Sequence, residues 1–226
     1  RGLEIVCANR IPHGRGLGSS SAAICAGLVA ARAVTIGAEA RLDDTAMLEL
    51  ATELEGHPDN VAACLLGGFT LSWMEDGAAR AIRMEPSDSI VPVVFVPTKP
   101  VLTETARSLL PRTVPHVDAA VNAGRAALLV EALTRRPELL FPATEDRLHQ
   151  EYRAPAMPES AALVERLRAD GIPAVISGAG PTVMALADEG TADKVEHLAG
   201  ADWAANRLSL DLQGACVLPL AVGTES

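Results

Sequence analysis

Apolar residues recur at helical spacing in the first third of the chain. Small and branched apolar side chains stand three or four positions apart between residues 19 and 36, which predicts a buried helix there. A second helix is predicted to begin after Asp43 or Asp44, either of which can cap it, and to end at Gly56. Pro58 fits the first turn of a short third helix.

Strand patterns lie on both sides of these helices. Residues 69–74 and 79–84 alternate apolar and polar side chains, and the turn residues Asp76-Gly77 between them predict a hairpin. Residues 3–8 predict a further strand near the start of the chain.

The second half of the chain alternates predicted strands and helices. Strands are predicted at 90–96, 173–177, 183–187, 207–212 and 215–218, and helices from Thr103 to before Pro111 and at 115–133, 158–170 and 191–198. The order strand, helix, strand, strand, helix, strand is typical of a split β-α-β layer, a ferredoxin-like α+β arrangement. Residues 85–89 are the best linker candidate.

Composition narrows the class of protein. The chain has 226 residues, 49% of them hydrophobic and 21% charged, as in a globular protein of one large or two small domains. The net charge is −10, basic residues are not clustered and 3% of residues are aromatic, so no nucleic-acid partner is expected. No apolar run could cross a bilayer, so no membrane partner is expected. The four cysteines and five histidines are scattered, which favours a reducing cytoplasm and indicates no transition-metal site.

A glycine-rich turn that runs into three serines is the strongest chemical signal. It comprises Pro12, His13, Gly14, Arg15, Gly16, Leu17, Gly18, Ser19, Ser20, Ser21 and Ala22. Glycines let the backbone approach a ligand, and the N-terminus of the following helix favours a bound phosphate. A Walker A loop would need Lys at position 19, and a dinucleotide fingerprint would need Gly there. The alternative is a plain helix cap after a flexible turn.

Three separated motifs together resemble one enzyme family. The string P-x-x-x-G-L-G-S-S-x-A over residues 12–22 resembles the nucleotide-binding motif of the GHMP kinase superfamily. Residues 55–68, Glu-Gly-His-Pro-Asp-Asn-Val-Ala-Ala-Cys-Leu-Leu-Gly-Gly, resemble a segment of its homoserine kinase branch. Residues 177–182, Ser-Gly-Ala-Gly-Pro-Thr, resemble the superfamily's C-terminal glycine-rich loop. The motifs occur in the family's order, and the resemblance covers essentially the whole chain.

The resemblance implies an α+β GHMP kinase fold. Residues 1–86 would be the remainder of a ribosomal-S5-like, ATP-binding N-terminal domain, and residues 87–226 a ferredoxin-like C-terminal domain. Homoserine kinases open with a P-x-S-x-A-N-L-G-x-G-F-D-like segment that supplies an Asn and an Asp to the substrate pocket, and nothing like it is present here. We therefore expect that the chain is truncated or that its first part was not included, and that the 226 residues alone have no measurable kinase activity.

The resemblance implies that Glu55 binds magnesium, and Ser20 of the glycine-rich turn could also ligate the ion; taken alone, Glu55 would fit a solvated helix end. A carboxylate at the end of a helix opposes the helix dipole, and a metal ion would offset that cost. Mg²⁺ prefers one or two carboxylates with phosphate oxygens and water. Glu49 and Glu53 share the predicted helix and are rival ligands.

His57, Asp59 and Asn60 form a polar turn that opens the third predicted helix. The resemblance implies that His57 contacts the amino-acid substrate and that Asn60 holds its reacting hydroxyl. Asp59 stands where other GHMP kinases carry a catalytic Asp. Whether it acts as a base or only caps the helix stays open, because phosphoryl transfer depends mainly on positioning and charge neutralisation.

The resemblance adds further substrate-binding residues: Thr103, Arg107, Arg153, Gly178 and Gly180. Thr103 and Arg107 are four positions apart and so share a helical face. Two arginines in one pocket would clamp a carboxylate, as an amino-acid substrate requires. An isolated Arg is usually a solvated surface charge, and the glycines alone would fit a plain Gly-Pro turn.

The predicted function is therefore that of a cytoplasmic homoserine kinase, an enzyme of threonine biosynthesis that uses ATP and Mg²⁺. Its partners would be ATP and L-homoserine, and a homodimer is compatible with the sequence. The alternatives are another GHMP kinase with a different alcohol substrate, and an inactive or non-catalytic homologue.

Overall fold

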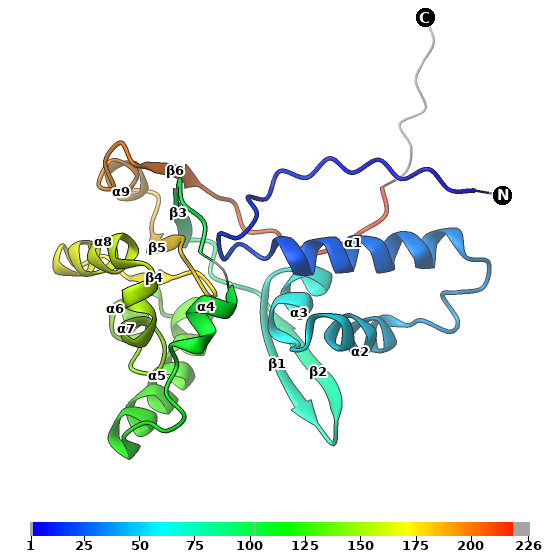
Figure 1. The fold of residues 1–226 in the computed structure, drawn as a ribbon, viewed down its shortest axis with the longest axis horizontal. Helices are drawn as coiled ribbons and strands as arrows, with labels where there is room; N and C mark the ends of the chain where they lie inside the picture. Colours follow the sequence, from blue (N-terminus) through cyan, green and yellow to red (C-terminus); the bar gives the residue numbers. More distant parts are fainter. Residues whose placement is uncertain (1, 102, 219–226) are drawn as a thin grey trace, which may run out of the picture. The chain divides into compact units, whose positions relative to one another are not determined.

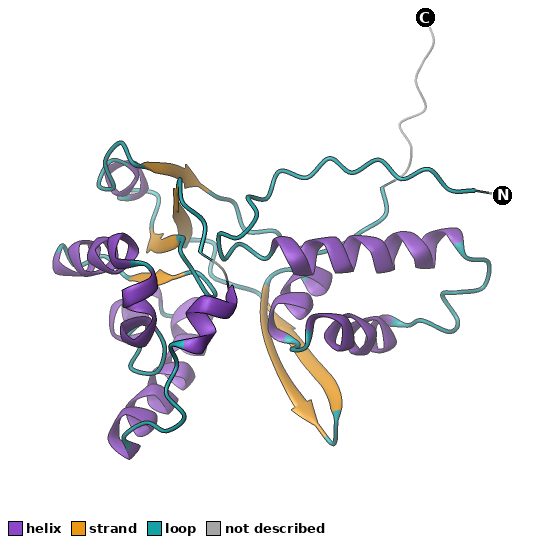
Figure 2. Cartoon of the chain, viewed as in Figure 1, coloured by secondary structure: helices purple, strands orange, loops and turns teal. Residues whose placement is uncertain are grey.

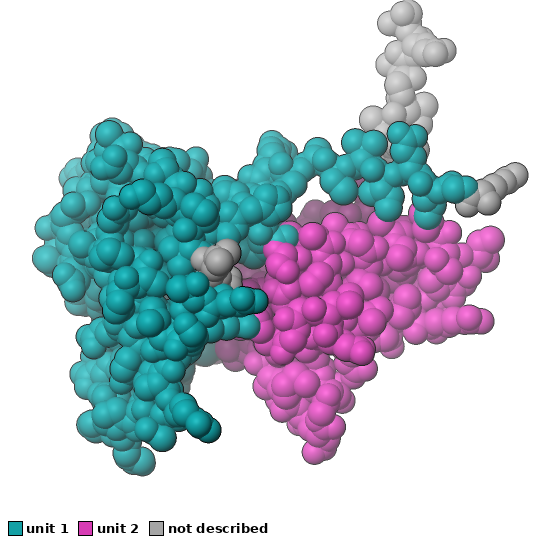
Figure 3. Space-filling view, viewed as in Figure 1, with its two compact units in different colours: residues 1–19, 89–132, 138–208 teal, residues 20–88, 133–137, 209–226 magenta. Residues whose placement is uncertain are grey.

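The structure, a computed structural model, describes residues 2–101 and 103–218. Backbone contacts divide them into two compact units (Figure 3). Unit 1 contains residues 2–19, 89–132 and 138–208, and unit 2 contains residues 20–88, 133–137 and 209–218. The units change over at residues 88 and 89, inside the predicted linker, and the first 19 residues cluster with the second half of the chain. Each unit has its own core.

Unit 2 is built from three helices and a hairpin (Figure 1). They are α1 (Ser19–Val34), α2 (Asp44–Glu55), α3 (Asp59–Leu66), β1 (Phe69–Glu75) and β2 (Ala78–Met84). Helix α2 packs on β2, and α3 packs on β1. The side chains that form the core are small or medium in size: Cys25, Leu48, Ala51, Val61, Ala62 and Ala79.

Local chemistry sets the limits of α2. The Asp43 carboxylate accepts a hydrogen bond of 2.9 Å from the backbone N–H of Ala46, which satisfies one of the free donors at the helix start. Gly56 ends the helix with φ 92°, and its N–H bonds the carbonyl oxygen of Thr52. Of the two aspartates considered from the sequence, Asp43 is therefore the cap, and Glu55 is fixed as the last residue of the helix.

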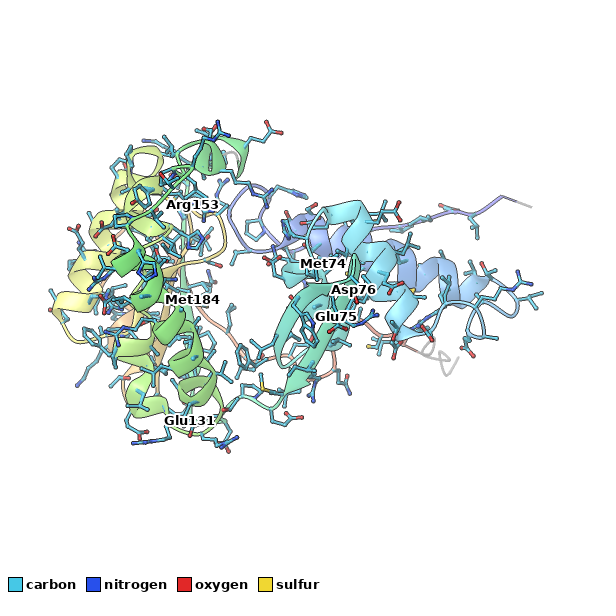
Figure 4. The ribbon with its side chains drawn as sticks, turned by 90° about the horizontal axis from the view of Figure 1, so that it is seen from below. Met74, Glu75, Asp76, Glu131, Arg153 and Met184 are labelled. Atoms are coloured by element: carbon cyan, nitrogen blue, oxygen red, sulfur yellow. The ribbon has the colours of Figure 1, made fainter. Side chains whose placement is uncertain are left out.

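The hairpin of unit 2 leaves one apolar face exposed. Its strands are antiparallel, with Leu71 opposite Ile82, and both side chains are more than one third exposed. Asp76 has φ 52°, as the predicted Asp-Gly turn requires. Figure 4 labels Met74, Glu75 and Asp76, which mark the end of β1 and the start of the turn.

Unit 1 is a four-stranded sheet with helices (Figure 2). Its strands are β3 (Val91–Pro97), β4 (Ala174–Ile176), β5 (Val183–Ala187) and β6 (Trp203–Arg207). Its helices are α4 (Thr103–Ser108), α5 (His116–Thr134, whose last two residues belong to unit 2), α6 (Leu140–Ala143), α7 (Gln150–Arg153), α8 (Pro158–Ala169) and α9 (Ala192–Glu196), with 3-10 turns η1 (Pro137–Leu139) and η2 (Ala154–Ala156).

The strand order is β4-β5-β3-β6, and every neighbouring pair is antiparallel. Numbered by their order in this unit, the strands run 2-3-1-4, which is the ferredoxin-like arrangement predicted from the sequence. Val91, Val93 and Phe95 alternate along β3 and point to one face, where α8 and α9 cover them.

Three predicted strands are wrong. Residues 3–8 are exposed and pair with no described segment, and a strand needs a partner for its backbone. The strand predicted at 207–212 overlaps the observed strand only at Arg207, because β6 runs from Trp203 to Arg207, the residues that pair with β3. Residues 215–218 are irregular as well. They follow a turn in which the Asp211 carboxylate accepts from the N–H groups of Gln213 and Gly214.

Candidate active site

Two glycine-rich loops meet in unit 1. The Ser177 hydroxyl donates to the carbonyl oxygen of Gly16 at 2.8 Å, and the Thr182 N–H donates to the carbonyl oxygen of Arg15 at 3.3 Å. The loop of residues 12–18 and the loop of residues 177–182, separated in sequence, are thus joined by hydrogen bonds.

Gly16 and Gly18 of the first loop have different surroundings. A Cβ on Gly16 would clash with the carbonyl oxygen of Ser177 and would lie 2.8 Å from that of Gly180. Gly16 is therefore required by the second loop. A Cβ on Gly18 would have no described atom within 4 Å, although its φ is +73°. Gly18 is thus the position where the backbone of this loop remains open to a ligand.

Arg107 and Arg153 come together in the same unit. The Arg153 Nη1 atom donates to the carbonyl oxygen of Gly178 at 3.2 Å, so this arginine lies against the second glycine loop. Figure 4 labels Arg153 on α7. Burial lowers the pKa of its guanidinium, the positive charge of Arg107 lowers it further, and Asp146 opposes the shift. Arg153 is partly buried and Arg107 is exposed, and two neighbouring positive charges favour an anion beside them.

Two buried polar atoms at this place lack a partner. The Nε atom of Arg153 and the Oγ1 atom of Thr182 are buried, and no hydrogen-bond acceptor or donor within residues 2–101 and 103–218 reaches them. Buried polar groups are normally satisfied by protein, water or ligand. Both residues belong to or contact the second glycine loop, Thr182 as its last residue and Arg153 through its bond to Gly178.

A turn before α7 positions Arg153. Asp146 accepts hydrogen bonds from the backbone N–H groups of His149 and Gln150 and contacts the ring of His149. The Gln150 side chain then accepts from the N–H of Ile176 at 2.7 Å, next to the glycine loop. Sequence reasoning missed these residues. The signal was an Asp three to four positions before polar residues, as at a helix start.

The candidate metal-binding residues meet within unit 2. Ser20 Oγ donates to Oε2 of Glu55 and Ser21 Oγ donates to Oε1, both at 2.9 Å. Ser21 is buried and Ser20 is exposed. The Ser21 hydroxyl therefore holds the carboxylate on its buried side, and solvent reaches the carboxylate on the side of Ser20. The rival Glu49 instead pairs with Arg80 at 3.1 Å, and Glu53 is exposed on the same helix.

The polar turn before α3 is held by its own side chains. The ring Nδ1 of His57 lies 2.5 Å from Oδ1 of Asp59, and that oxygen also accepts from the N–H of Asn60 at 2.6 Å. Pro58, not Asp59, occupies the cap position of α3. Asp59 therefore orients His57 and the first turn of the helix.

The other predicted site residues have these positions. Pro12, His13, Leu17 and their neighbours form the first glycine loop, and Ser19 to Ala22 form the first turn of α1. Arg107 lies in the last turn of α4. Thr103 begins that helix, and its side chain lies outside the described part of the structure.

The chain matches two family models, "GHMP kinases N terminal domain" over residues 1–68 and "GHMP kinases C terminal" over residues 119–203. It belongs to the GHMP kinase family, and the predicted fold is confirmed.

Its relatives include homoserine kinases. It is 88% identical to that of Streptomyces coelicolor over all of this chain and 73% of the relative. It is also 88% identical to that of Streptomyces avermitilis, over 98% of this chain and 72% of the relative. A solved homoserine kinase from Cytophaga hutchinsonii has a TM-score of 0.80 at 26% identity and covers 91% of this chain and 69% of its own.

Proposed function

We propose that this chain transfers the γ-phosphoryl group of ATP to the side-chain hydroxyl of L-homoserine, a step of threonine biosynthesis. The 88% identity to a homoserine kinase over the whole chain supports the substrate. The observation that carries the proposal is the meeting of Arg107 and Arg153 beside the glycine loop, with the Nε atom of Arg153 buried and unbonded within the described residues. Such a pair suits the carboxylate of an amino acid.

The first glycine loop and the start of α1 are assigned to ATP. Gly18 leaves the backbone open, and the first turn of α1 carries no acidic residue. The free N–H groups of a helix start attract phosphate oxygens, and Ser19, Ser20 and Ser21 add hydroxyl donors there. This part of the chain would hold the triphosphate.

Ser20 and Glu55 fit a magnesium ion. Their oxygens lie 2.9 Å apart, and carboxylate and hydroxyl oxygens are the hard ligands that Mg²⁺ prefers. A bound Mg²⁺ would neutralise charge on the phosphate oxygens. Ser21 keeps the carboxylate of Glu55 oriented from the buried side.

The transfer itself needs few groups from the protein. The homoserine oxygen forms a bond to the γ-phosphorus, the bond from that phosphorus to ADP breaks, and the hydroxyl proton passes to Asp59 or to solvent water. Asn60 would hold the hydroxyl and His57 the amino-acid part of the substrate, with Asp59 orienting His57. Asp59 stays a candidate base, because positioning and charge neutralisation account for most of the catalysis.

A substrate panel tests the proposal. The full-length protein is assayed for ATP consumption with L-homoserine, L-serine, L-threonine and mevalonate, and the product is followed by phosphorus NMR. Homoserine should give the highest kcat/KM and a phosphate ester on its side chain. Faster turnover of a substrate without the amino group would assign the chain to another GHMP kinase activity. No turnover of any alcohol would favour a non-catalytic homologue.

The setting of the reaction is also proposed. The cysteines at positions 7, 25, 64 and 216 are all free thiols, which supports a reducing cytoplasm, where ATP is available. Among the described residues, no helix is long and apolar enough to span a bilayer. A homodimer stays a prediction, which sedimentation velocity can test.

A further inference from the structure

Arg15 lies in the middle of the first glycine loop, where its charge suggests a contact with phosphate. In the structure, its guanidinium instead donates to backbone carbonyl oxygens. Nε donates to the carbonyl oxygen of Pro97 at 2.9 Å, Nη2 to that of Thr98 at 2.5 Å, and Nη1 to that of His13 at 3.1 Å. All three nitrogens of the side chain are engaged with backbone carbonyls.

These carbonyls belong to the end of β3 and to the loop itself. Pro97 is the last residue of β3, and it is buried. The same segment makes a second connection, in which the N–H of Val101 donates to the carbonyl oxygen of Gly14 at 3.3 Å. A Cβ on Gly14 would be in ordinary van der Waals contact with the Cβ of Pro100, at 3.4 Å, so this part of the loop lies beside Pro100.

The backbone of Arg15 bonds a different segment, the second glycine loop. Its carbonyl oxygen accepts from the N–H of Thr182, in the second glycine loop. Arg15 therefore connects three segments that are far apart in sequence: residues 12–18, residues 97–98 and residues 177–182. Helix α4, which carries Arg107, begins at Thr103, five positions after Thr98.

We propose that Arg15 is a positioning residue, which fixes the nucleotide loop to the end of β3 through backbone carbonyls and does not itself bind phosphate. A guanidinium with its donors in a fixed planar fork suits several carbonyls at once. The inference rests on the proposed assignment of residues 12–22 to ATP. It predicts that the Arg15 side chain orders residues 12–18 even when no nucleotide is bound.

The test compares Arg15→Ala, Arg15→Gln and Arg15→Lys in the full-length protein, with Arg10→Ala as the matched control because Arg10 is an exposed arginine of the same segment. The first readout is amide hydrogen exchange without nucleotide. Arg15→Ala should speed exchange in residues 13–18 and at Val101, whose N–H bonds Gly14. Arg10→Ala should leave it unchanged.

The second readout is ATP affinity by calorimetry at several salt concentrations. Arg15→Ala should weaken binding about tenfold, from the loss of several hydrogen bonds that order the loop. Arg15→Gln should recover part of that loss through its amide donors, and Arg15→Lys should stay weaker than the wild type. The salt dependence of binding should be unchanged, because no charge at the phosphates is removed.

A direct phosphate contact makes the opposite predictions. ATP binding would then lose salt dependence in Arg15→Ala, Arg15→Lys would bind almost as the wild type, and exchange without nucleotide would not change. Those results, or unaltered ATP affinity in Arg15→Ala, would overturn the inference. Because the readouts use exchange and ATP binding, they are independent of whether homoserine is the acceptor. If Arg15→Ala does not fold, the Gln and Lys variants still separate the two roles.

Discussion

Ser177 donates its hydroxyl proton to the carbonyl oxygen of Gly16 at 2.8 Å, across 161 positions of sequence. The Ser177 hydroxyl of the second glycine loop thus binds the backbone of the first loop at Gly16. A Cβ at Gly16 would clash with backbone atoms of the second loop, so its absence lets the two loops pack together. The first glycine loop is therefore shaped by a distant part of unit 1 as well as by its own residues.

Gly16→Ala should destabilise the protein far more than Gly18→Ala. Both glycines have positive φ, so each substitution strains the backbone by about 1–2 kcal/mol. At Gly16 the new Cβ also meets backbone atoms that cannot move aside, which adds roughly 1–3 kcal/mol. Urea unfolding midpoints measure the difference. Equal midpoints in the two variants would show that the loops do not pack as described.

Glu55→Gln should abolish turnover and leave the fold intact. The amide keeps polar atoms for Ser20 and Ser21 but loses the negative charge that would face the metal. Losing several kcal/mol of transition-state stabilisation lowers kcat by roughly 10²–10⁴-fold. Circular dichroism checks the fold, and Glu53→Gln, an exposed carboxylate on the same helix, is the control. Near-normal kcat in Glu55→Gln would remove Glu55 from the metal site.

Arg107→Ala and Arg153→Ala should each weaken homoserine use and leave ATP use almost unchanged. Each removes a charge-assisted contact of about 1.5–3 kcal/mol, so KM for homoserine should rise roughly 10- to 150-fold. Steady-state kinetics with each substrate varied in turn give both values. Arg112→Ala, an exposed arginine just after α4, should change neither. A comparable rise in KM for ATP would place the pair at the nucleotide instead.

Asp146 should make stability depend on acid pH. Burial would raise the pKa of its carboxyl, but hydrogen bonds from the His149 ring and from the N–H groups of Gln150 and His149 lower it to about 2. The carboxylate therefore stabilises the fold above the unfolded pKa, near 3.8, and this stabilisation is lost as pH falls toward 2.

The measurement is the thermal midpoint between pH 5 and pH 2 for the wild type and Asp146→Asn. Asp146→Asn should be less stable at pH 5 by about 2 kcal/mol, with the gap closing as pH falls toward 2. Because the turn holds Arg153, KM for homoserine should rise as well. A gap that stays constant over this range would mean that the charge of Asp146 is not what stabilises the turn.

Local patterns predicted most helices and strands of this chain. The cap Asp43, the stop Gly56 and the Asp76-Gly77 turn depend on residues within a few positions, so the sequence signals them directly. The failures are segments whose state depends on a partner. Residues 3–8 have a strand pattern without a described partner, and β6 forms over residues 203–207, which pair with β3, and not over the predicted 207–212.

The candidate site shows the same limit. The pairing of Ser20 with Glu55 follows from motifs that the family resemblance supplied. By contrast, the acceptors of Arg15 are backbone carbonyls, which have no side-chain signature, so no local pattern could indicate them. Asp146 likewise acts through the backbone of a turn and only then on Arg153.

The last described segment of the chain completes unit 2. The N–H of Gly68 donates to the carbonyl oxygen of Asp211, and the N–H of Ala215 donates to that of Cys64. Arg83 adds a bond from its guanidinium to the carbonyl oxygen of Leu212. During synthesis on the ribosome, α1 to β2 emerge long before these residues, and the part of unit 1 from residue 89 to residue 208 is made in between. A nascent chain stalled after β6 therefore carries a finished ferredoxin-like sheet, while Cys64 in α3 and Gly68 just after it still lack their backbone partners from residues 211–215.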